Sequence, residues 1–244
     1  MIKIIQTGPF QVNSLLVDLS GPDFVSGDKI FITDPADCDF SLDSNSILNF
    51  VEEKKLEIAF VLLTHGHFDH VSGLKSIKKQ FPEVPVLIHL KDGDFLGEKG
   101  NYTQKLSLEM MGFEEFLPFV TDLPCADGFL EEGENLFSAL KKGNALCKNR
   151  VKLFGEKEEA ALSDWRVLHT PGHTEGSVCI YNEKQRSLIA GDTVFYHSLG
   201  RTDLPGGSEG AIQKSLKRLY HELSSNTLVY SGHEYCGFTL GENL

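Results

Sequence analysis

One short segment places four potential metal ligands within six residues. It reads His65-Gly66-His67-Phe68-Asp69-His70. An apolar run at 58–63 precedes it and a stretch with helical spacing follows it, so we expect a turn between a buried strand and a helix. Such a turn can direct His65 and His67 to one point and Asp69 and His70 to a neighbouring point. Imidazole and carboxylate together favour zinc or another first-row metal ion.

Three further candidate ligands each follow a glycine near the expected end of a strand. They are His173 in HTPGHT, Asp192 in AGDT and His233 in SGHE. Seven candidates are too many for one tetrahedral zinc ion but suffice for two ions if one carboxylate bridges them. We expect Asp192 to be that bridge. The expected cofactor is therefore two Zn²⁺ ions, with iron or manganese as alternatives.

A single histidine at a strand end is usually a hydrogen-bonding residue, so the case for His173 and His233 depends on the neighbouring cluster. The other histidines lack that support, and we expect structural or surface roles for them. They are His89, His169, His197 and His221. Of these, only His197, in the loop after Asp192, has a position from which it could face a substrate.

The elements that must position these residues occur twice in the chain. A hairpin at 14–34 ends in an aspartate and is followed by a helix and a strand that ends at His65. A second hairpin at 177–192 also ends in an aspartate, and a helix near 210–223 and a strand ending at His233 follow it. Two such halves predict an α+β fold, a four-layer αββα sandwich with the site at one edge.

Asp34 occupies the place in the first half that Asp192 occupies in the second. No candidate ligand adjoins it in the sequence. We therefore expect it to stabilise its turn or to orient a ligand rather than to bind a metal ion.

The composition limits the classes of partner. The chain has 244 residues and a formal net charge of −12, which disfavours nucleic acid as a partner. The longest apolar run, Ile58–Leu63, is too short to span a membrane, and the N-terminus lacks a signal-peptide pattern. Five cysteines without a CxxC pair suit reduced thiols. We expect a cytoplasmic enzyme with a small-molecule substrate, and the oligomeric state stays open.

No linker composition divides the chain, so we expect a single domain over 1–244. The stretch at 126–164 mixes Leu and Phe with many charges, including Lys141 and Arg150. It is either a lid that offers positive charge to a substrate or a solvated surface excursion. The second interpretation is the simpler one, since charged segments usually face water.

The motif from Thr64 to His70, together with the three later candidates, resembles the signature of the metallo-β-lactamase superfamily, and the resemblance covers nearly the whole chain. Segments 200–208 (GRTDLPGGS) and 231–235 (SGHEY) are similar to the glyoxalase II-like, or hydroxyacylglutathione hydrolase-like, branch. The resemblance implies the following ligand sets. The first ion would be held by His65, His67 and His173, and the second ion by Asp69, His70 and His233. Both ions would share Asp192.

The resemblance also implies a reaction, hydrolysis of a small acyl thioester such as a hydroxyacylglutathione by a metal-bridging hydroxide. The catalytic residue Asp69 would orient the hydroxide, and a thiolate of pKa about 8.5 can leave without a general acid. Arg201 stands where glyoxalase II has a basic substrate-binding residue, but an ion pair with Asp203 is an equal alternative. Eleven residues follow His233, so we expect the helical domain of glyoxalase II to be absent.

Two other functions stay open. Persulfide dioxygenases, which hold a single iron, share much of this residue set and the GRTD segment. A non-catalytic binding module stabilised by metal would keep the ligands without turnover. A drug-hydrolysing β-lactamase fits less well, because the zinc β-lactamases with a cysteine ligand carry it where this chain has Asp192.

Overall fold

The computed structural model describes residues 1–21 and 23–243. Its first sheet has six strands in the order β1-β2-β3-β4-β5-β6. Strands β1 to β3 pair antiparallel, and β3 to β6 pair parallel. The strands are β1 (Ile2–Thr7), β2 (Val12–Asp18), β3 (Lys29–Thr33), β4 (Glu57–Leu62), β5 (Val86–His89) and β6 (Gly128–Leu130).

The second sheet has five strands in the order β13-β12-β9-β8-β7, of which β9 and β12 are the parallel pair. They are β7 (Trp165–His169), β8 (Val178–Asn182), β9 (Ser187–Gly191), β12 (Leu228–Ser231) and β13 (Phe238–Thr239). A separate small hairpin joins β10 (Val194–Phe195) to β11 (Ser198–Leu199).

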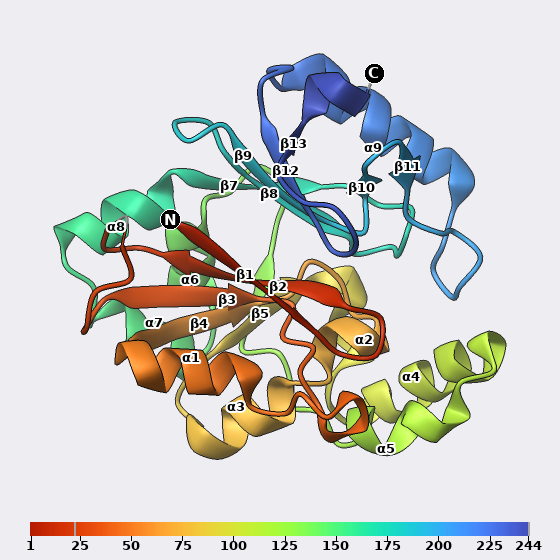
Figure 1. Cartoon of the computed structure of the whole chain (residues 1–244), viewed down its shortest axis with the longest axis horizontal. Coiled ribbons are helices and arrows are strands. Elements are labelled where there is room, and N and C mark those ends of the chain that lie inside the picture. The colour runs from red at the N-terminus through yellow and green to blue at the C-terminus, as the bar shows by residue number, and fades with distance from the viewer. Residues whose placement is uncertain (22, 244) are drawn as a thin grey trace.

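Helices cover the outer faces of the two sheets, with α1 and α3 beneath the first sheet and α9 above the second (Figure 1). The helices are α1 (Ser46–Lys54), α2 (Phe68–Val71), α3 (Leu74–Gln80), α4 (Gly97–Met111), α5 (Leu117–Val120), α6 (Leu136–Lys142), α7 (Ala145–Val151), α8 (Glu156–Ser163) and α9 (Glu209–Glu222). Short 3₁₀ helices are η1 (Asp39–Ser41), η2 (Leu90–Phe95), η3 (Glu114–Phe116) and η4 (Leu240–Asn243).

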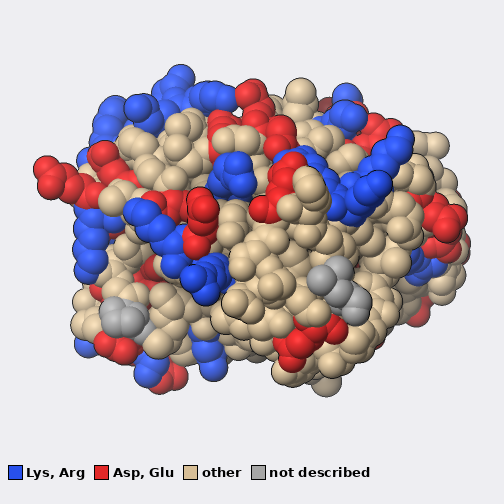
Figure 2. All heavy atoms as spheres, turned by 90° about the horizontal axis from the view of Figure 1, so that it is seen from above, with Lys and Arg blue, Asp and Glu red and all other residues tan. Residues whose placement is uncertain are grey.

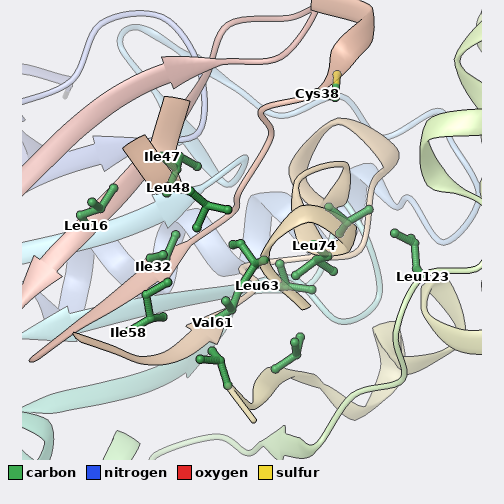
Figure 3. Packing of buried hydrophobic residues seen from close by; sticks show 14 of the residues in the cluster. Leu16, Ile32, Cys38, Ile47, Leu48, Ile58, Val61, Leu63, Leu74 and Leu123 are labelled. Carbon is green, nitrogen blue, oxygen red and sulfur yellow. The ribbon is translucent and has the colours of Figure 1, made fainter. Parts of the chain in front are cut away.

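Strand alternation explains why the sheets stack in this way. Successive side chains of a strand point to opposite faces, and all seven residues of β2 are buried. Leu16 belongs to the cluster that packs the first sheet against α1 and α3, part of which Figure 3 shows. Leu15 and Val17 belong to the cluster between the two sheets, and a third cluster joins the second sheet to α9. The three clusters fill the three interfaces of a four-layer αββα sandwich, which confirms the predicted fold class.

The two halves have the same connectivity. In the first half, the hairpin β2-β3 leads through α1 to β4, which lies parallel to β3. In the second half, the hairpin β8-β9 leads through α9 to β12, which lies parallel to β9. Because parallel neighbours end at the same edge, each half brings an aspartate and a histidine to one edge of its sheet.

The segment at 126–164 contains β6 and helices α6 to α8. Strand β6 extends the first sheet beside β5, and Leu136 and Leu140 of α6 are fully buried in the cluster between the sheets. On the face seen from above, acidic and basic side chains are interspersed (Figure 2). Among the described residues, the helices are too short or too polar to cross a bilayer.

Candidate metal centre

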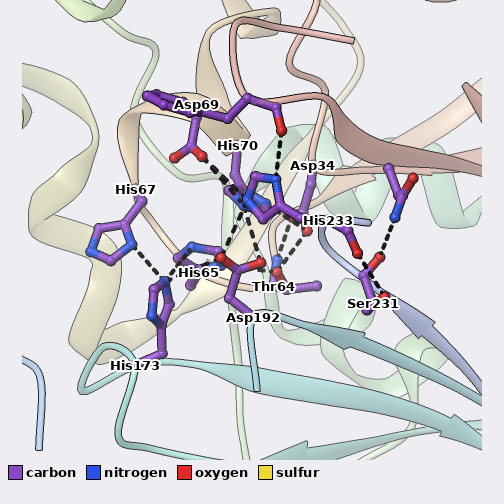
Figure 4. Close-up of polar contacts among 12 residues, drawn as sticks. Asp34, Thr64, His65, His67, Asp69, His70, His173, Asp192, Ser231 and His233 are labelled. Carbon is purple, nitrogen blue, oxygen red and sulfur yellow. Dashed lines mark hydrogen bonds and ion pairs between the residues drawn. The ribbon is translucent and has the colours of Figure 1, made fainter. Parts of the chain in front are cut away.

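The predicted ligands meet where strands from both sheets end, as Figure 4 shows. Strand β4 stops at Leu62, and the turn that follows carries His65 and His67 before α2 starts at Phe68. Thr64 anchors this turn to Asp34, at the end of β3. Its backbone N–H donates to Asp34 Oδ1 at 2.7 Å, and its hydroxyl donates to Oδ2 at 2.6 Å.

The first group consists of His65, His67 and His173, whose ligand atoms all lie within 4.8 Å of one another. His173 Nε2 is 2.8 Å from His67 Nδ1 and 3.2 Å from His65 Nε2. His173 Nδ1 is 2.7 Å from the carbonyl oxygen of Arg201, and a carbonyl can only accept a hydrogen bond. Nδ1 therefore carries the proton, and Nε2 presents a lone pair toward the other two rings.

The second group consists of Asp69, His70 and His233. His233 Nε2 lies 3.4 Å from Asp69 Oδ2 and 3.2 Å from His70 Nε2. His233 Nδ1 lies 2.9 Å from the carbonyl oxygen of Phe10, so Nδ1 carries a proton and Nε2 is the atom directed into the group.

Asp192 lies between the two groups. Its Oδ2 is 3.5 Å from His173 Nε2 in the first group and 3.3 Å from His233 Nε2 in the second. Its Oδ1 is 3.3 Å from His70 Nε2. One carboxylate therefore faces both clusters of nitrogen atoms.

Glycines allow this close approach. A Cβ atom on Gly232 would collide with Asp192 Oδ1, and one on Gly191 would collide with the Thr64 hydroxyl. Gly191 also has a φ of +47°, in the left-handed region. A larger residue at Gly191 would push the second sheet away from the turn after β4, and one at Gly232 would displace the Asp192 carboxylate.

Burial lowers the pKa of His65, His67 and His173, which keeps these rings neutral as metal ligands must be. Burial would also lower the pKa of His233, but Asp192 and the hydrogen bonds to Asp192 and Asp69 raise it to about 10. Burial would raise the pKa of Asp192, but His70 and His233 hold it well below its usual range. The carboxylates of the site are thus ionised and are stabilised by positive charge.

These residues fit a pair of metal ions. His173 Nε2 can accept a hydrogen bond from only one of the two imidazole nitrogens that it faces at 2.8 and 3.2 Å, so the other nitrogen lacks a partner unless a cation lies between them. Among the described residues, Asp192 Oδ1 is buried without a hydrogen-bond partner. A cation near these atoms would compensate both features, and a mixed imidazole and carboxylate set is typical of zinc and iron sites.

A cavity of about 390 Å³ opens over the two groups. His67, Asp69, His173, Asp192 and His233 line one side of it. The other lining residues are Phe10, Phe68, Met111, Phe195, Arg201, Leu204 and Glu234. All of these come from outside the segment at 126–164.

The model of the metallo-beta-lactamase superfamily matches residues 7–233, which is nearly the whole chain. The chain belongs to the metallo-beta-lactamase superfamily. It is 29% identical to the probable metallo-hydrolase YqgX of Bacillus subtilis, over 93% of this chain and 86% of that protein. It is 25% identical to the hydroxyacylglutathione hydrolase GloC of Haemophilus influenzae, over 95% of this chain and 90% of that protein.

Solved structures of the superfamily are similar over the full chain. The BLEG-1 B3 metallo-beta-lactamase has a TM-score of 0.74 at 27% identity and covers 99% of this chain and 95% of its own. The protein TTHA1623, solved in a di-iron-bound form, has a TM-score of 0.70 at 28% identity. The match covers 98% of this chain and 96% of the TTHA1623 chain. Members with this fold therefore include both a metallo-beta-lactamase and a protein that binds two iron ions.

Asp34 lies close to the metal centre, although no candidate ligand adjoins it in the sequence. Its Oδ2 lies 3.2 Å from His70 Nδ1, and it forms a third compact group with His65 and His70. Because His70 Nε2 faces Asp69 and Asp192, its other nitrogen is the one that meets Asp34. Carboxylates commonly orient ligand histidines in metal sites in this way.

Asp92, in η2, is a buried carboxylate that sequence reasoning missed. Its Oδ2 accepts the backbone N–H of Gly66 at 3.0 Å and the Thr174 hydroxyl at 2.7 Å, and its Oδ1 accepts the N–H of Gly176 at 2.7 Å. It therefore ties the turn that carries His65 and His67 to the loop that carries His173. Its neighbours in the sequence, HLKDGDF, contain no signal that distinguishes it from a surface aspartate.

Arg201 forms the ion pair that was the alternative to substrate binding. Its Nε and Nη2 donate to Asp203 at 2.8 and 2.9 Å, and these hydrogen bonds lower the pKa of Asp203 to about 2. Arg201 nevertheless lines the cavity.

The remaining histidines lie outside the cavity wall formed by the described residues. His89 and His169 stack on each other with ring centroids 4.2 Å apart. His221 is in the last turn of α9, and His197 is exposed in the turn between β10 and β11.

Proposed function

We propose that the protein is a dinuclear metal-dependent hydrolase of small acyl thioesters such as hydroxyacylglutathiones. The observation that carries the proposal is the position of Asp192, whose carboxylate faces both ligand groups at 3.3 to 3.5 Å. The similarity to the hydroxyacylglutathione hydrolase GloC supports the choice of thioester. We expect it to act in the cytoplasm.

The ligand assignment follows the two groups. His65, His67 and His173 would hold the first ion and Asp69, His70 and His233 the second, with Asp192 shared. Zinc suits this set, and iron or manganese would use the same atoms. Bound at these groups, the ions would lower the pKa of a coordinated water to about 7 and polarise the substrate carbonyl.

The protein's own side chains supply orientation. Asp69 lines the cavity and is 8% exposed, so its carboxylate can accept a hydrogen bond from the attacking water and direct it to the acyl carbon. The fixed tautomers of His173 and His233 aim their Nε2 atoms into the site. A thiolate leaves unaided because its conjugate acid has a pKa of about 8.5.

Arg201 is the basic residue of the cavity wall, and we assign it to contact with a carboxylate of the substrate. Its guanidinium already donates twice to Asp203. The substrate therefore competes with an exposed ion pair, and the contact contributes modestly to binding.

The test is hydrolysis of S-lactoylglutathione by protein reconstituted with zinc, with metal content measured on the same sample. Thiol release by protein that holds two ions per chain is the expected result. The Asp192→Asn variant should lose both metal and activity, and Asp203→Asn, on the cavity rim, should lose neither. Failure to cleave any acyl thioester, with persulfide-dependent oxygen uptake by an iron-loaded form, would favour a single-iron dioxygenase instead.

A further inference from the structure

We infer that the acyl group of the substrate is apolar and binds against a hydrophobic wall of the cavity, so the enzyme prefers aliphatic or aromatic acyl thioesters to hydroxyacyl ones. This inference rests on the proposed thioesterase function and names its substrate class. In the reaction, the oxygen of water bonds to the acyl carbon and the carbon–sulfur bond breaks. The products are a carboxylate, a thiol and a proton.

The wall adjoins the ligand groups: Phe68 lies between His67 and Asp69 in the chain, and the rings of Phe195 and His233 are 6.1 Å apart. It consists of Phe10, Phe68, Met111, Phe195 and Leu204. These side chains carry no hydrogen-bonding group other than the weak acceptor sulfur of the methionine. A hydroxyl group placed against them would lose its hydrogen bonds to water without replacement, which disfavours a hydroxyacyl substrate.

The wall is held in place by aromatic packing. Phe68 is 2% exposed, and the Phe10 ring meets it edge to face with centroids 5.8 Å apart. Phe10 also meets Phe113 at 5.4 Å, and Phe68 meets Phe116 at 5.7 Å. The surface is therefore formed by rings that several neighbours fix, and an acyl chain would bind to it without first ordering it.

The position of the wall assigns it to the acyl group. The ligand side of the cavity must receive the carbonyl carbon, since Asp69 and Asp192 lie there. A volume of about 390 Å³ is at the lower end of the range for small-molecule sites, roughly 300–1,000 Å³. Because the apolar side chains adjoin the ligand groups, we assign the space against them to the acyl substituent of that carbon.

The carrier thiol would then lie at the opening, where the exposed charged residues are. Arg201 and Glu234 line the cavity and are exposed, and Asp203 pairs with Arg201 there. Polar carriers such as a glutathione moiety suit this rim, whereas the interior suits hydrocarbon.

The experiment measures kcat/KM for acetyl, butyryl, hexanoyl and lactoyl thioesters of glutathione with the same metal-loaded protein. Each methylene that moves from water to an apolar wall should raise kcat/KM roughly three- to fourfold until the cavity is filled. The butyryl ester should therefore exceed the acetyl ester by roughly tenfold, and it should exceed the lactoyl ester as well.

A pair of adjacent methionines gives a matched control. Met111 lines the cavity, whereas Met110 is 54% exposed and does not. Met111→Ala should lower the ratio of kcat/KM for the butyryl ester to that for the acetyl ester several-fold. Met110→Ala should leave this ratio unchanged. A fall in total activity without a change in the ratio would mean that Met111 does not contact the acyl group, and it would overturn the assignment of the wall.

The outcomes separate the two proposals. Hydrolysis of all four thioesters at similar kcat/KM, or preference for the lactoyl ester, would overturn the acyl-group inference and leave the thioesterase proposal in place. Hydrolysis of none of them would overturn both.

Discussion

Asp34 occupies the left-handed region, with a φ of 49°, and directs its carboxylate at Thr64 and His70. Asparagine tolerates this conformation as well as aspartate does. Asp34→Asn should therefore preserve the fold but weaken the orientation and basicity of His70. We expect metal affinity to fall roughly 10- to 100-fold, as for other outer carboxylates of metal sites.

Competition with a chelator of known affinity measures this effect directly. A merely structural role for Asp34 would lower the free energy of unfolding of the metal-free protein while leaving metal affinity unchanged. That result would contradict the prediction that Asp34 raises metal affinity through its contact with His70.

Arg201 and Asp203 provide paired variants with opposite expected effects. Arg201→Ala removes the cation of the cavity rim, so KM for glutathione thioesters should rise while kcat changes less. Asp203→Asn frees the guanidinium from its partner, so KM should fall. Both changes should be about two- to fivefold, in keeping with an exposed ion pair. Equal KM values in the two variants and the parent would exclude a substrate contact by Arg201.

At the scale of residues, the sequence predicted the seven side chains that the structure gathers, because their motif and glycine neighbours are local signals. It predicted that Asp34 stabilises its turn or orients a ligand but did not identify His70 as the partner, and it did not predict the role of Asp92. Asp92 bonds to Gly66 and Gly176, which lie 26 and 84 residues away. Contacts of that separation depend on how the two sheets stack, and no local pattern records them.

The link between β3 and α1 contains the buried carboxyl group of Asp37, and burial destabilises its ionised form. Asp37 is 1% exposed and accepts the N–H of Ile47, in the first turn of α1, at 3.4 Å. Its Oδ1 is buried and has no partner among the described residues. Burial raises the pKa of Asp37 from 3.8 to about 6.

This shift predicts a pH dependence of stability. Below pH 3.8 the group is protonated in both the folded and the unfolded chain. Between pH 3.8 and about 6 only the unfolded chain ionises, so the free energy of unfolding falls as pH rises and then stays level. A shift of about two units corresponds to roughly 3 kcal/mol.

Asp37→Asn removes this ionisation and keeps an oxygen acceptor for Ile47. Relative to the parent chain, the variant should gain up to roughly 3 kcal/mol between pH 3.5 and pH 7. Urea unfolding of both metal-free proteins at the two pH values measures the difference. If the difference between variant and parent is the same at both pH values, Asp37 is not the titrating group.

At the scale of elements, the apolar run predicted the strand at 58–63 and the repeated order of elements predicted the helix near 210–223, which the structure has as β4 and α9. The segment at 126–164 was harder to interpret because charges interrupt its apolar residues. Two of its helices, α6 and α7, start at asparagine caps, such as Asn135, which accepts the N–H of Ser138 at 2.8 Å. Their buried faces meet strands of both sheets, and that packing has no signature within the segment.

The stacking of two sheets holds the whole molecule together, and Phe31 lies at its centre. Its ring stacks on Phe60 at 5.1 Å and meets Trp165 of the second sheet edge to face at 5.8 Å. Phe31→Ala should lower the free energy of unfolding by about 3–5 kcal/mol, because it leaves a cavity between the sheets. Phe129→Ala is the control, since Phe129 is 41% exposed in β6 and should cost less than about 1 kcal/mol.

Denaturant unfolding of both variants checks this prediction. A loss of similar size in the two variants would mean that the interface between the sheets contributes no more than a surface strand does. It would contradict the prediction that packing between the two sheets stabilises the fold that positions the metal centre.

If Asp192 is shared between two ligand groups, full activity requires two bound ions, and a zinc titration measures this requirement. Zinc is added in steps to metal-free protein, and the rate of thiol release from its fastest glutathione thioester is followed at each step. We expect the rate to rise until two equivalents per chain are bound, and we expect the Asp192→Asn variant not to reach that rate. A full rate at one equivalent, or two bound ions without hydrolysis of any thioester, would contradict it.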